Sequence, residues 1–160
     1  MGIITYLIFV LAIFIFPIAS ISCPSGFTLL VSTSRCAKFI SGELNYDGAT
    51  LSCNSSGGKL ISIHNAIDNR VMMQFANSSI TNDNYNYWLG LKCSETGNPN
   101  ACAWADSTKF SYSGFAKAYP NTGYGNCVFV ETAGNSAGQW FSATCNAIRT
   151  NAICEIAVNS

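Results

Sequence analysis

Residues 87–91 read Tyr-Trp-Leu-Gly-Leu, a compact run of aromatic and aliphatic residues that predicts a β-strand. Short strands separated by turns are predicted after it, at residues 128–130, 139–141 and 152–154. The helical patterns all precede it, and strands do not alternate with helices. The sequence therefore predicts an α+β fold with a largely antiparallel sheet.

One predicted helix is marked by residues spaced three and four positions apart, namely Tyr46, Ala49, Thr50 and Cys53. Asn45 is placed to cap its start, and the glycines at 57 and 58 end it. Short strands are predicted on either side of this helix, over residues 27–31 and 60–63.

A second helix is predicted directly after residue 65. Asn65 is its N-cap, and Asp68 lies in the first turn, where the helix dipole favours a carboxylate. Ile67, Val71 and Phe75 recur at helical spacing and are predicted to form its apolar stripe.

Residues 92–126 show little periodicity and are rich in Gly, Pro, Asn and Ser, which predicts a long irregular region. Such a region inside a compact domain is uncommon, and it is usually functional or specially braced. Six aromatic residues lie in it, and four of them are gathered towards its end: Tyr112, Phe115, Tyr119 and Tyr124. They could contact a ligand, or they could fill a small core of the loop itself, and for any single one the core is favoured.

The N-terminal segment carries no charge and is mostly apolar, and the small residues Ser20 and Ser22 precede Cys23. This layout predicts a secretory signal peptide over residues 1–22, cleaved before Cys23. A retained signal-anchor helix is the alternative, but Pro17 interrupts the apolar run and favours cleavage. Residues 23–160 then form one domain, and no other stretch is apolar and long enough to span a bilayer.

The charges balance, with eight basic and eight acidic residues. Nucleic acids and anionic membrane surfaces attract proteins with a basic excess, so neither is expected as a partner. The polar surface must instead consist chiefly of Asn, Ser and Thr, which suits recognition by hydrogen bonds.

Eight cysteines follow the predicted cleavage site, and in an exported chain this even number predicts four disulfides. No two of them have the close spacing of a zinc site. The spacing alone leaves the connectivity open. Asn54 and Asn77 begin N-x-Ser sequons, so both are candidate glycosylation sites.

Six short motifs occur in a specific order along the chain: Cys23-Pro24-x-Gly26, Gly58-x-Leu60, Trp88-Leu89-Gly90-Leu91, Trp104-Ala105-Asp106-Ser107, Gly138-Gln139-Trp140 and Cys154-Glu155. Together they resemble the C-type lectin-like domain family over nearly all of residues 23–155. The resemblance implies two helices, mostly antiparallel strands and a long irregular loop region. It also implies four disulfide pairs: Cys23–Cys36, Cys53–Cys154, Cys93–Cys102 and Cys127–Cys145.

In sugar-binding members of that family, a Glu-Pro-Asn or Gln-Pro-Asp triplet and a Trp-Asn-Asp triplet bind one calcium ion, which in turn binds two sugar hydroxyls. The corresponding positions here read Tyr119-Pro120-Asn121 and Trp140-Phe141-Ser142, and Asn126 stands where an acid is expected. Calcium takes about 6–8 oxygen ligands and favours carboxylates. We therefore predict that the usual sugar-site calcium is absent, and we assign no other cofactor or metal ligand. The sequence leaves open a calcium held elsewhere in the fold by Glu43, Asp47 and Glu155.

The resemblance also indicates where a ligand would bind. The candidate ligand-binding residues are Tyr119, Pro120, Asn121, Tyr124, Asn126 and Trp140. The Tyr-Pro-Asn triplet is either a reshaped ligand loop or a scaffold kept after the calcium site was lost.

Catalysis is not expected. His64 is the only histidine, and its place between a strand and a helix cap favours a solvated or capping role. A zinc-protease motif needs two histidines, and no paired acids cluster in the loop region.

The sequence thus predicts a secreted, extracellular recognition module. One hypothesis is calcium-free glycan recognition, which by resemblance suits innate recognition of microbial surfaces. The alternative is a protein-binding module without lectin activity. A structural matrix role has no repeat or low-complexity segment to support it.

Overall fold

A computed structural model of the chain describes residues 22–81 and 83–158. The predicted signal peptide lies outside these residues except for Ser22. In chain order the elements are β1 (Thr28–Leu30), β2 (Arg35–Leu44), α1 (Tyr46–Ser55), β3 (Lys59–Leu60), α2 (Ala66–Ser79), β4 (Asn86–Cys93), β5 (Cys102–Trp104), β6 (Cys127–Glu131), β7 (Trp140–Ala143) and β8 (Thr150–Ala157). Short 3₁₀ turns occupy Pro99–Ala101 and Gly134–Ser136.

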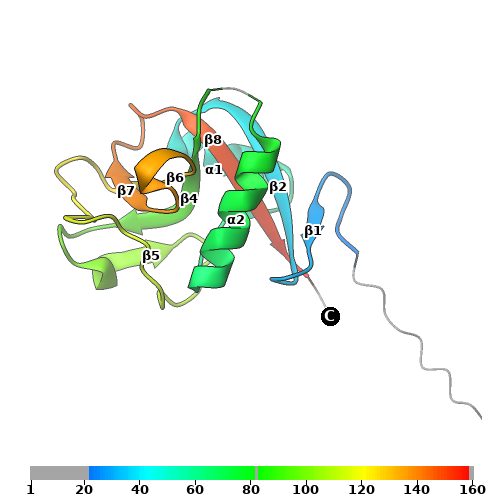
Figure 1. Cartoon of the computed structure of the whole chain (residues 1–160), viewed down its shortest axis with the longest axis horizontal. Helices are drawn as coiled ribbons and strands as arrows, with labels where there is room; N and C mark the ends of the chain where they lie inside the picture. Colours follow the sequence, from blue (N-terminus) through cyan, green and yellow to red (C-terminus); the bar gives the residue numbers. More distant parts are fainter. Residues whose placement is uncertain (1–21, 82, 159–160) are drawn as a thin grey trace, which may run out of the picture.

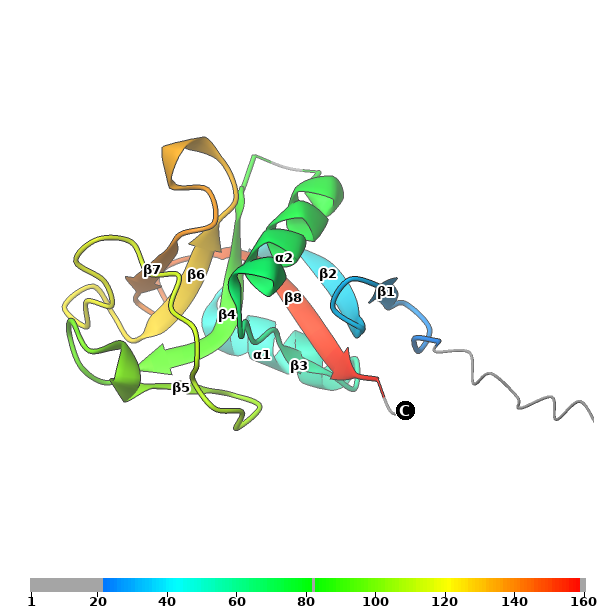
Figure 2. The same ribbon diagram turned by 60° about the horizontal axis from the view of Figure 1, so that its bottom comes forward.

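The strands form one sheet in the order β1-β2-β8-β4-β6-β7, with β3 paired to β8 and β5 paired to β4. All pairs are antiparallel except β4 with β8, which is parallel. The predicted α+β fold with a mostly antiparallel sheet is therefore confirmed. Figures 1 and 2 show α1 and α2 on opposite sides of β8.

Each helix covers its own part of the hydrophobic core. Met72 and Ala76 of α2 pack into one cluster, together with Leu89, Leu91 and Trp140. Tyr46, Ala49 and Cys53 of α1 pack into a second cluster, which includes Trp88 of β4. The indole N–H of Trp88 donates to the carbonyl of Leu44 at 2.8 Å. Because β4 contributes to both clusters, its burial on both faces agrees with its nearly continuous apolar sequence.

Both predicted helix starts are confirmed. The side-chain oxygen of Asn45 accepts from the amide of Gly48 at 2.8 Å, and that of Asn65 accepts from the amide of Asp68 at 2.9 Å. Each cap satisfies an amide that has no partner within its helix. The four disulfides implied by the resemblance are also present: Cys23–Cys36, Cys53–Cys154, Cys93–Cys102 and Cys127–Cys145.

The buried face of α2 lies about one residue further along the helix than the sequence predicted. The buried residues of the helix are Asp68, Met72 and Ala76, whereas Ile67 is 66% exposed. The helix turns Asp68 inward because its carboxylate accepts from the amide of His64 at 3.3 Å and faces Arg35.

A charged network joins α2 to strands β2 and β8. Arg35 of β2 forms an ion pair with Glu155 of β8, and its Nη1 atom lies 3.8 Å from Oδ2 of Asp68. The Glu155 carboxylate also accepts from the amide and the hydroxyl of Ser62, each at 2.7 Å. Burial lowers the pKa of the Arg35 guanidinium, against the opposing attraction of Asp68 and Asp106.

Three strands differ from the sequence prediction. The ten-residue strand β2 was not predicted, and neither was β5, which lies in the region expected to be irregular. The apolar strand expected over residues 60–63 is reduced to the two residues of β3. In the described part of the chain, no helix is long and apolar enough to cross a membrane.

Candidate functional site

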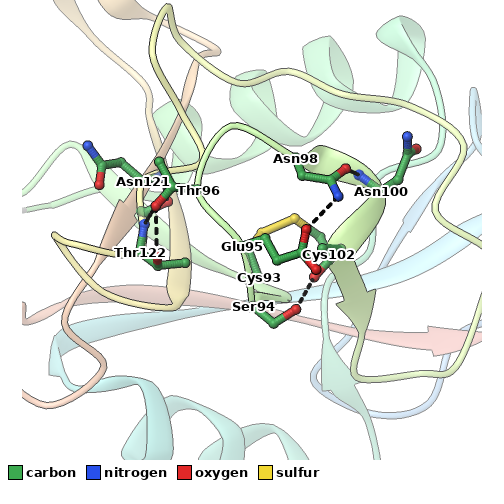
Figure 3. The surroundings of a disulfide bond; sticks show 11 residues. Cys93, Ser94, Glu95, Thr96, Asn98, Asn100, Cys102, Asn121 and Thr122 are labelled. Carbon is green, nitrogen blue, oxygen red and sulfur yellow. Dashed lines mark hydrogen bonds between the residues drawn. A yellow bond between two sulfur atoms is a disulfide. The ribbon is translucent and has the colours of Figure 1, made fainter.

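The long irregular region is braced by a small disulfide loop. Cys93–Cys102 closes this loop between β4 and β5, and the chain from Thr96 to Gly97 contacts the segment around Pro120. The amide of Gly97 donates to the carbonyl of Pro120 at 2.7 Å. Thr96 Oγ1 accepts from the amide of Thr122 at 3.0 Å, and the two threonine hydroxyls are 2.7 Å apart (Figure 3).

Aromatic rings run from the core to the surface across three neighbouring strands. Trp88, Phe129 and Phe141 are cross-strand partners on β4, β6 and β7. Phe129 and Phe141 stack with 5.7 Å between ring centroids. Tyr119 meets Phe141 edge-on at 5.0 Å, and Tyr124 lies 5.9 Å from Tyr119. Tyr124 ends this series and is 61% exposed.

These rings line an open groove of about 460 Å³. We call it the aromatic groove, and its lining residues are Tyr119, Tyr124, Phe129, Glu131, Phe141, Ser142, Ala143, Thr144 and Ile148. Most of the lining is aromatic or aliphatic, and a few hydroxyls and one carboxylate supply the polar groups. Mostly apolar walls with few polar groups are typical of small-ligand sites.

The structure places the predicted ligand residues in three different settings. Tyr119 and Tyr124 lie in the aromatic groove. Pro120 is buried behind it, after a cis peptide bond with Tyr119. Asn126 is exposed, and its carbonyl accepts from the amide of Cys93 at 2.9 Å.

Trp140 lies in the core and does not reach the loop surface. Its exposed fraction is 0%, and its indole N–H donates to the side chain of Asn69 at 2.9 Å. The rings of Tyr112 and Phe115 pack against it edge-on, at 5.6 and 5.5 Å. These two aromatic residues of the long loop therefore fill a core, which is the role the sequence favoured for any single one.

Asn121 holds the loop in place through its backbone and side chain. Its amide donates to Ser142 Oγ at 2.9 Å, and its side-chain oxygen accepts from the amide of Gly123 at 3.0 Å. In Figure 3 its side chain points away from the disulfide loop.

The residues at the usual sugar-site position do not fit a calcium ion. The oxygens of Asn121 and Ser142 already take part in internal hydrogen bonds, and Tyr119 and Phe141 present rings instead of carboxylates. Among residues 22–81 and 83–158, no three His, Cys, Asp or Glu side chains are grouped so that they could hold a metal.

Seven residues that line the groove were not among the predicted ligand-binding residues: Phe129, Glu131, Phe141, Ser142, Ala143, Thr144 and Ile148. For Phe129 and Glu131, the signal that could have found them is strand alternation. Val128 and Val130 are buried, so the residues between and after them, Phe129 and Glu131, face the other side of β6.

The two sequon asparagines differ in their surroundings. Asn54 is exposed near the end of α1. Asn77 of α2 is also exposed, but its side-chain amide donates to the carbonyl of Thr132 at 3.1 Å.

The family is decided by a comparison with known domains, in which residues 42–156 match the model described as the lectin C-type domain. The chain belongs to the C-type lectin family. Its C-type lectin-like domain thus contains both helices and every strand from β3 to β7, together with the aromatic groove.

Relatives and solved structures agree with this membership. C-type lectin domain-containing protein 38 of Caenorhabditis elegans is 34% identical over 142 residues, covering 86% of this chain and 35% of that protein. The galactose-specific lectin nattectin of Thalassophryne nattereri is 30% identical over 103 residues, covering 64% of this chain and 62% of that protein. The chain therefore spans about a third of the nematode protein and less than two thirds of nattectin.

Among solved structures, the calcium-independent C-type lectin SPL-2 from Saxidomus purpuratus superposes with a TM-score of 0.70. The sequence identity is 21%, and the match covers 86% of this chain and 96% of that one. At this identity the likeness shows a shared fold, and the fold alone.

Proposed function

We propose that this C-type lectin-like domain is a secreted recognition module that binds a glycan in the aromatic groove without the usual sugar-site calcium. The observation that carries the proposal is the contact between Tyr119 and Phe141. Their rings meet, 5.0 Å apart, where sugar-binding family members have calcium ligands.

The groove has the chemistry that a sugar ring needs. A sugar presents apolar C–H faces and a rim of hydroxyls. The exposed ring of Tyr124 offers an apolar face with a hydrogen-bonding tip. The exposed hydroxyl of Thr144, which donates to the carbonyl of Tyr124 at 3.3 Å, lies at the same rim.

The names of two relatives are compatible with such a function. One is described as a galactose-specific lectin and another as a calcium-independent C-type lectin. Four disulfides support export to an oxidising compartment, because such bonds rarely persist in the cytosol. Recognition of microbial surfaces in innate defence is the setting we propose for an exported module of this kind.

Protein recognition is the second candidate function. The observation that favours it is the exposure of two large apolar side chains at the groove, Tyr124 at 61% and Ile148 at 38%. Tyrosine is enriched among the residues that dominate protein–protein binding energy.

A glycan array with the oxidised mature domain tests the proposal, run once in millimolar calcium and once with a chelator. We expect binding to the same glycans in both conditions. Tyr124→Ala should abolish it, whereas Tyr85→Ala should not, because Tyr85 is also exposed but lies outside the groove. Binding that disappears with the chelator would refute the calcium-free mechanism. No binding to any glycan on the array, together with capture of a protein ligand, would favour the second function.

A further inference from the structure

Glu131 is the single charged residue in the lining of the aromatic groove. It ends β6 and is half-buried. In the part of the chain that the structure describes, its carboxylate has no hydrogen-bond or ion-pair partner, and no Lys or Arg lines the groove. A carboxylate in a groove that holds no basic residue is available to pair with a cationic group of a ligand.

The strand register sets the carboxylate beside the aromatic rings. Glu131 and Phe129 are two positions apart on β6, so both side chains leave the same face of the sheet. On that face Phe129 is stacked on Phe141, its partner on β7. The amide of Glu131 donates to the carbonyl of Gln139 at 3.2 Å, which keeps the end of β6 paired beyond Trp140.

Aromatic faces and carboxylates both attract cations. The negative face of an aromatic ring attracts a cation, and the attraction grows when water is excluded. A carboxylate adds a charge-assisted hydrogen bond, which is about twice as strong as a neutral one. Neutral sugar hydroxyls would use the rings but would leave the carboxylate without its counter-charge.

We propose that the aromatic groove binds an amino sugar with a free ammonium group, whose ammonium pairs with Glu131 while the ring packs on Tyr124 and Tyr119. The ligand class is a 2-amino-2-deoxyhexose chain that is not N-acetylated. This proposal rests on the glycan-binding function proposed above and specifies its ligand.

The charge balance of the molecule supports this choice over an acidic sugar. An acidic glycan would meet the Glu131 carboxylate without a basic residue in the groove to offset the repulsion. An N-acetylated sugar is neutral at the same position and gains no ion pair. The groove therefore distinguishes these sugars by the charge of the substituent that meets Glu131.

The test is calorimetric titration of the oxidised mature chain with four probes: a glucosamine tetramer, an N-acetylglucosamine tetramer, a glucose tetramer and tetralysine. We expect the glucosamine tetramer to bind about tenfold or more tightly than the N-acetylated one, in line with a charge-assisted contact. Added salt should weaken its binding, because part of the attraction is between charges.

Glu131→Gln isolates the carboxylate and keeps the shape of the side chain. It should weaken glucosamine-tetramer binding about tenfold and leave the N-acetylated tetramer unaffected. The matched control is Glu43→Gln, which makes the same change in net charge at an exposed position outside the groove. Circular dichroism establishes that both variants are folded.

The possible failures are distinguishable. If the neutral tetramers bind as tightly as the glucosamine tetramer and Glu131→Gln changes nothing, the amino-sugar inference is wrong and the glycan function stands. If tetralysine binds as tightly, with the same dependence on Glu131, the groove recognises ammonium groups of peptides and the sugar assignment is wrong. If no glycan binds here or on the array, both proposals fail.

Discussion

The hydroxyls of Thr96 and Thr122 lie 2.7 Å apart and join the Cys93–Cys102 loop to the loop that carries Tyr119 and Tyr124. Thr96→Val keeps the shape of the side chain and removes this link. Because the site is exposed and water can replace the hydroxyl, we expect the free energy of unfolding to fall by only about 1 kcal/mol. Hydrogen exchange at the Thr122 amide, which loses its acceptor, should become clearly faster.

Ser94→Ala is the control for this prediction. The Ser94 hydroxyl donates to the carbonyl of Ala101 at 3.1 Å, so it stabilises the same disulfide loop without touching the aromatic groove. Exchange at Thr122 should not change in this variant. Equal exchange rates in Thr96→Val and the unmodified chain would show that the two loops are held together by other contacts.

The Arg35–Glu155 pair predicts a stability effect far from the groove. Side-chain exposures of 15% and 12% place both groups largely out of water. Glu155→Gln should lower the free energy of unfolding by about 3 kcal/mol, because it removes the closer of the two carboxylates paired with the guanidinium and leaves only Asp68, at 3.8 Å. Urea denaturation measures this, with the exposed Glu43→Gln expected to stay within about 0.5 kcal/mol of the unmodified chain. A loss as small as that of the control would mean that the pair is solvated.

Alkaline pH is predicted to destabilise the fold through Tyr46. Burial, with a contribution from Asp47, raises the pKa of Tyr46 to about 12. An unfolded chain releases this proton near pH 10, so between about 10 and 12 the unfolded state binds fewer protons than the folded one. The free energy of unfolding contributed by Tyr46 is intact below that window and falls by up to about 1.4 kcal/mol per pH unit within it.

Tyr46→Phe removes the titrating group and keeps the ring that packs edge-on against Trp88 at 5.5 Å. Denaturation curves from pH 8 to 11 should show a shallower decline for this variant. Tyr124→Phe, at an exposed ring, should follow the unmodified chain. Identical slopes for Tyr46→Phe and the unmodified chain would contradict the assignment to Tyr46. Burial also raises the pKa of Tyr87, so Tyr87→Phe should add to the effect.

Helix caps and the central strand could be predicted because each depends on a few residues of distinctive chemistry. The disulfide pairs followed only from the resemblance to the C-type lectin-like family, because the cysteine spacing leaves the connectivity open. Asn45 and Asn65 cap their helices as side-chain acceptors do in general. Strand β2 escaped prediction because its burial pattern does not alternate: Cys36 and Ala37 are both buried and three partly buried residues follow. The α2 stripe was misplaced because Asp68 turns inward to meet Arg35, a partner 33 positions away that no local pattern reveals.

The candidate site was predicted in part for similar reasons. Tyr119 and Tyr124 belong to a recognisable loop and do lie in the groove. Trp140 lies not in the groove but in the core, where its indole donates to Asn69 of α2. Glu131 lines the groove because β6 pairs with β7, and both strands lie within the loop that the Cys127–Cys145 disulfide closes. Contacts of this kind depend on tertiary structure, which local periodicity does not encode.

Gly125 makes the sharpest prediction about the groove, because it adopts φ +128° and its backbone touches β7. A Cβ at this position would lie 2.2 Å from the carbonyl carbon of Ala143, a backbone atom that cannot move aside without displacing the strand. Gly125→Ala should therefore lower the free energy of unfolding by about 3 kcal/mol or more, and it should widen the groove by separating Tyr124 from β7.

Gly97→Ala is the control that measures the cost of backbone strain without a steric clash. Gly97 also has a positive φ, at +70°, but a Cβ there would meet nothing within 4 Å. Its substitution should cost only about 1–2 kcal/mol, the penalty of a left-handed conformation. Urea denaturation of the two variants gives both costs. Equal losses would show that Ala143 yields to the added methyl group, and groove binding should then survive Gly125→Ala unchanged.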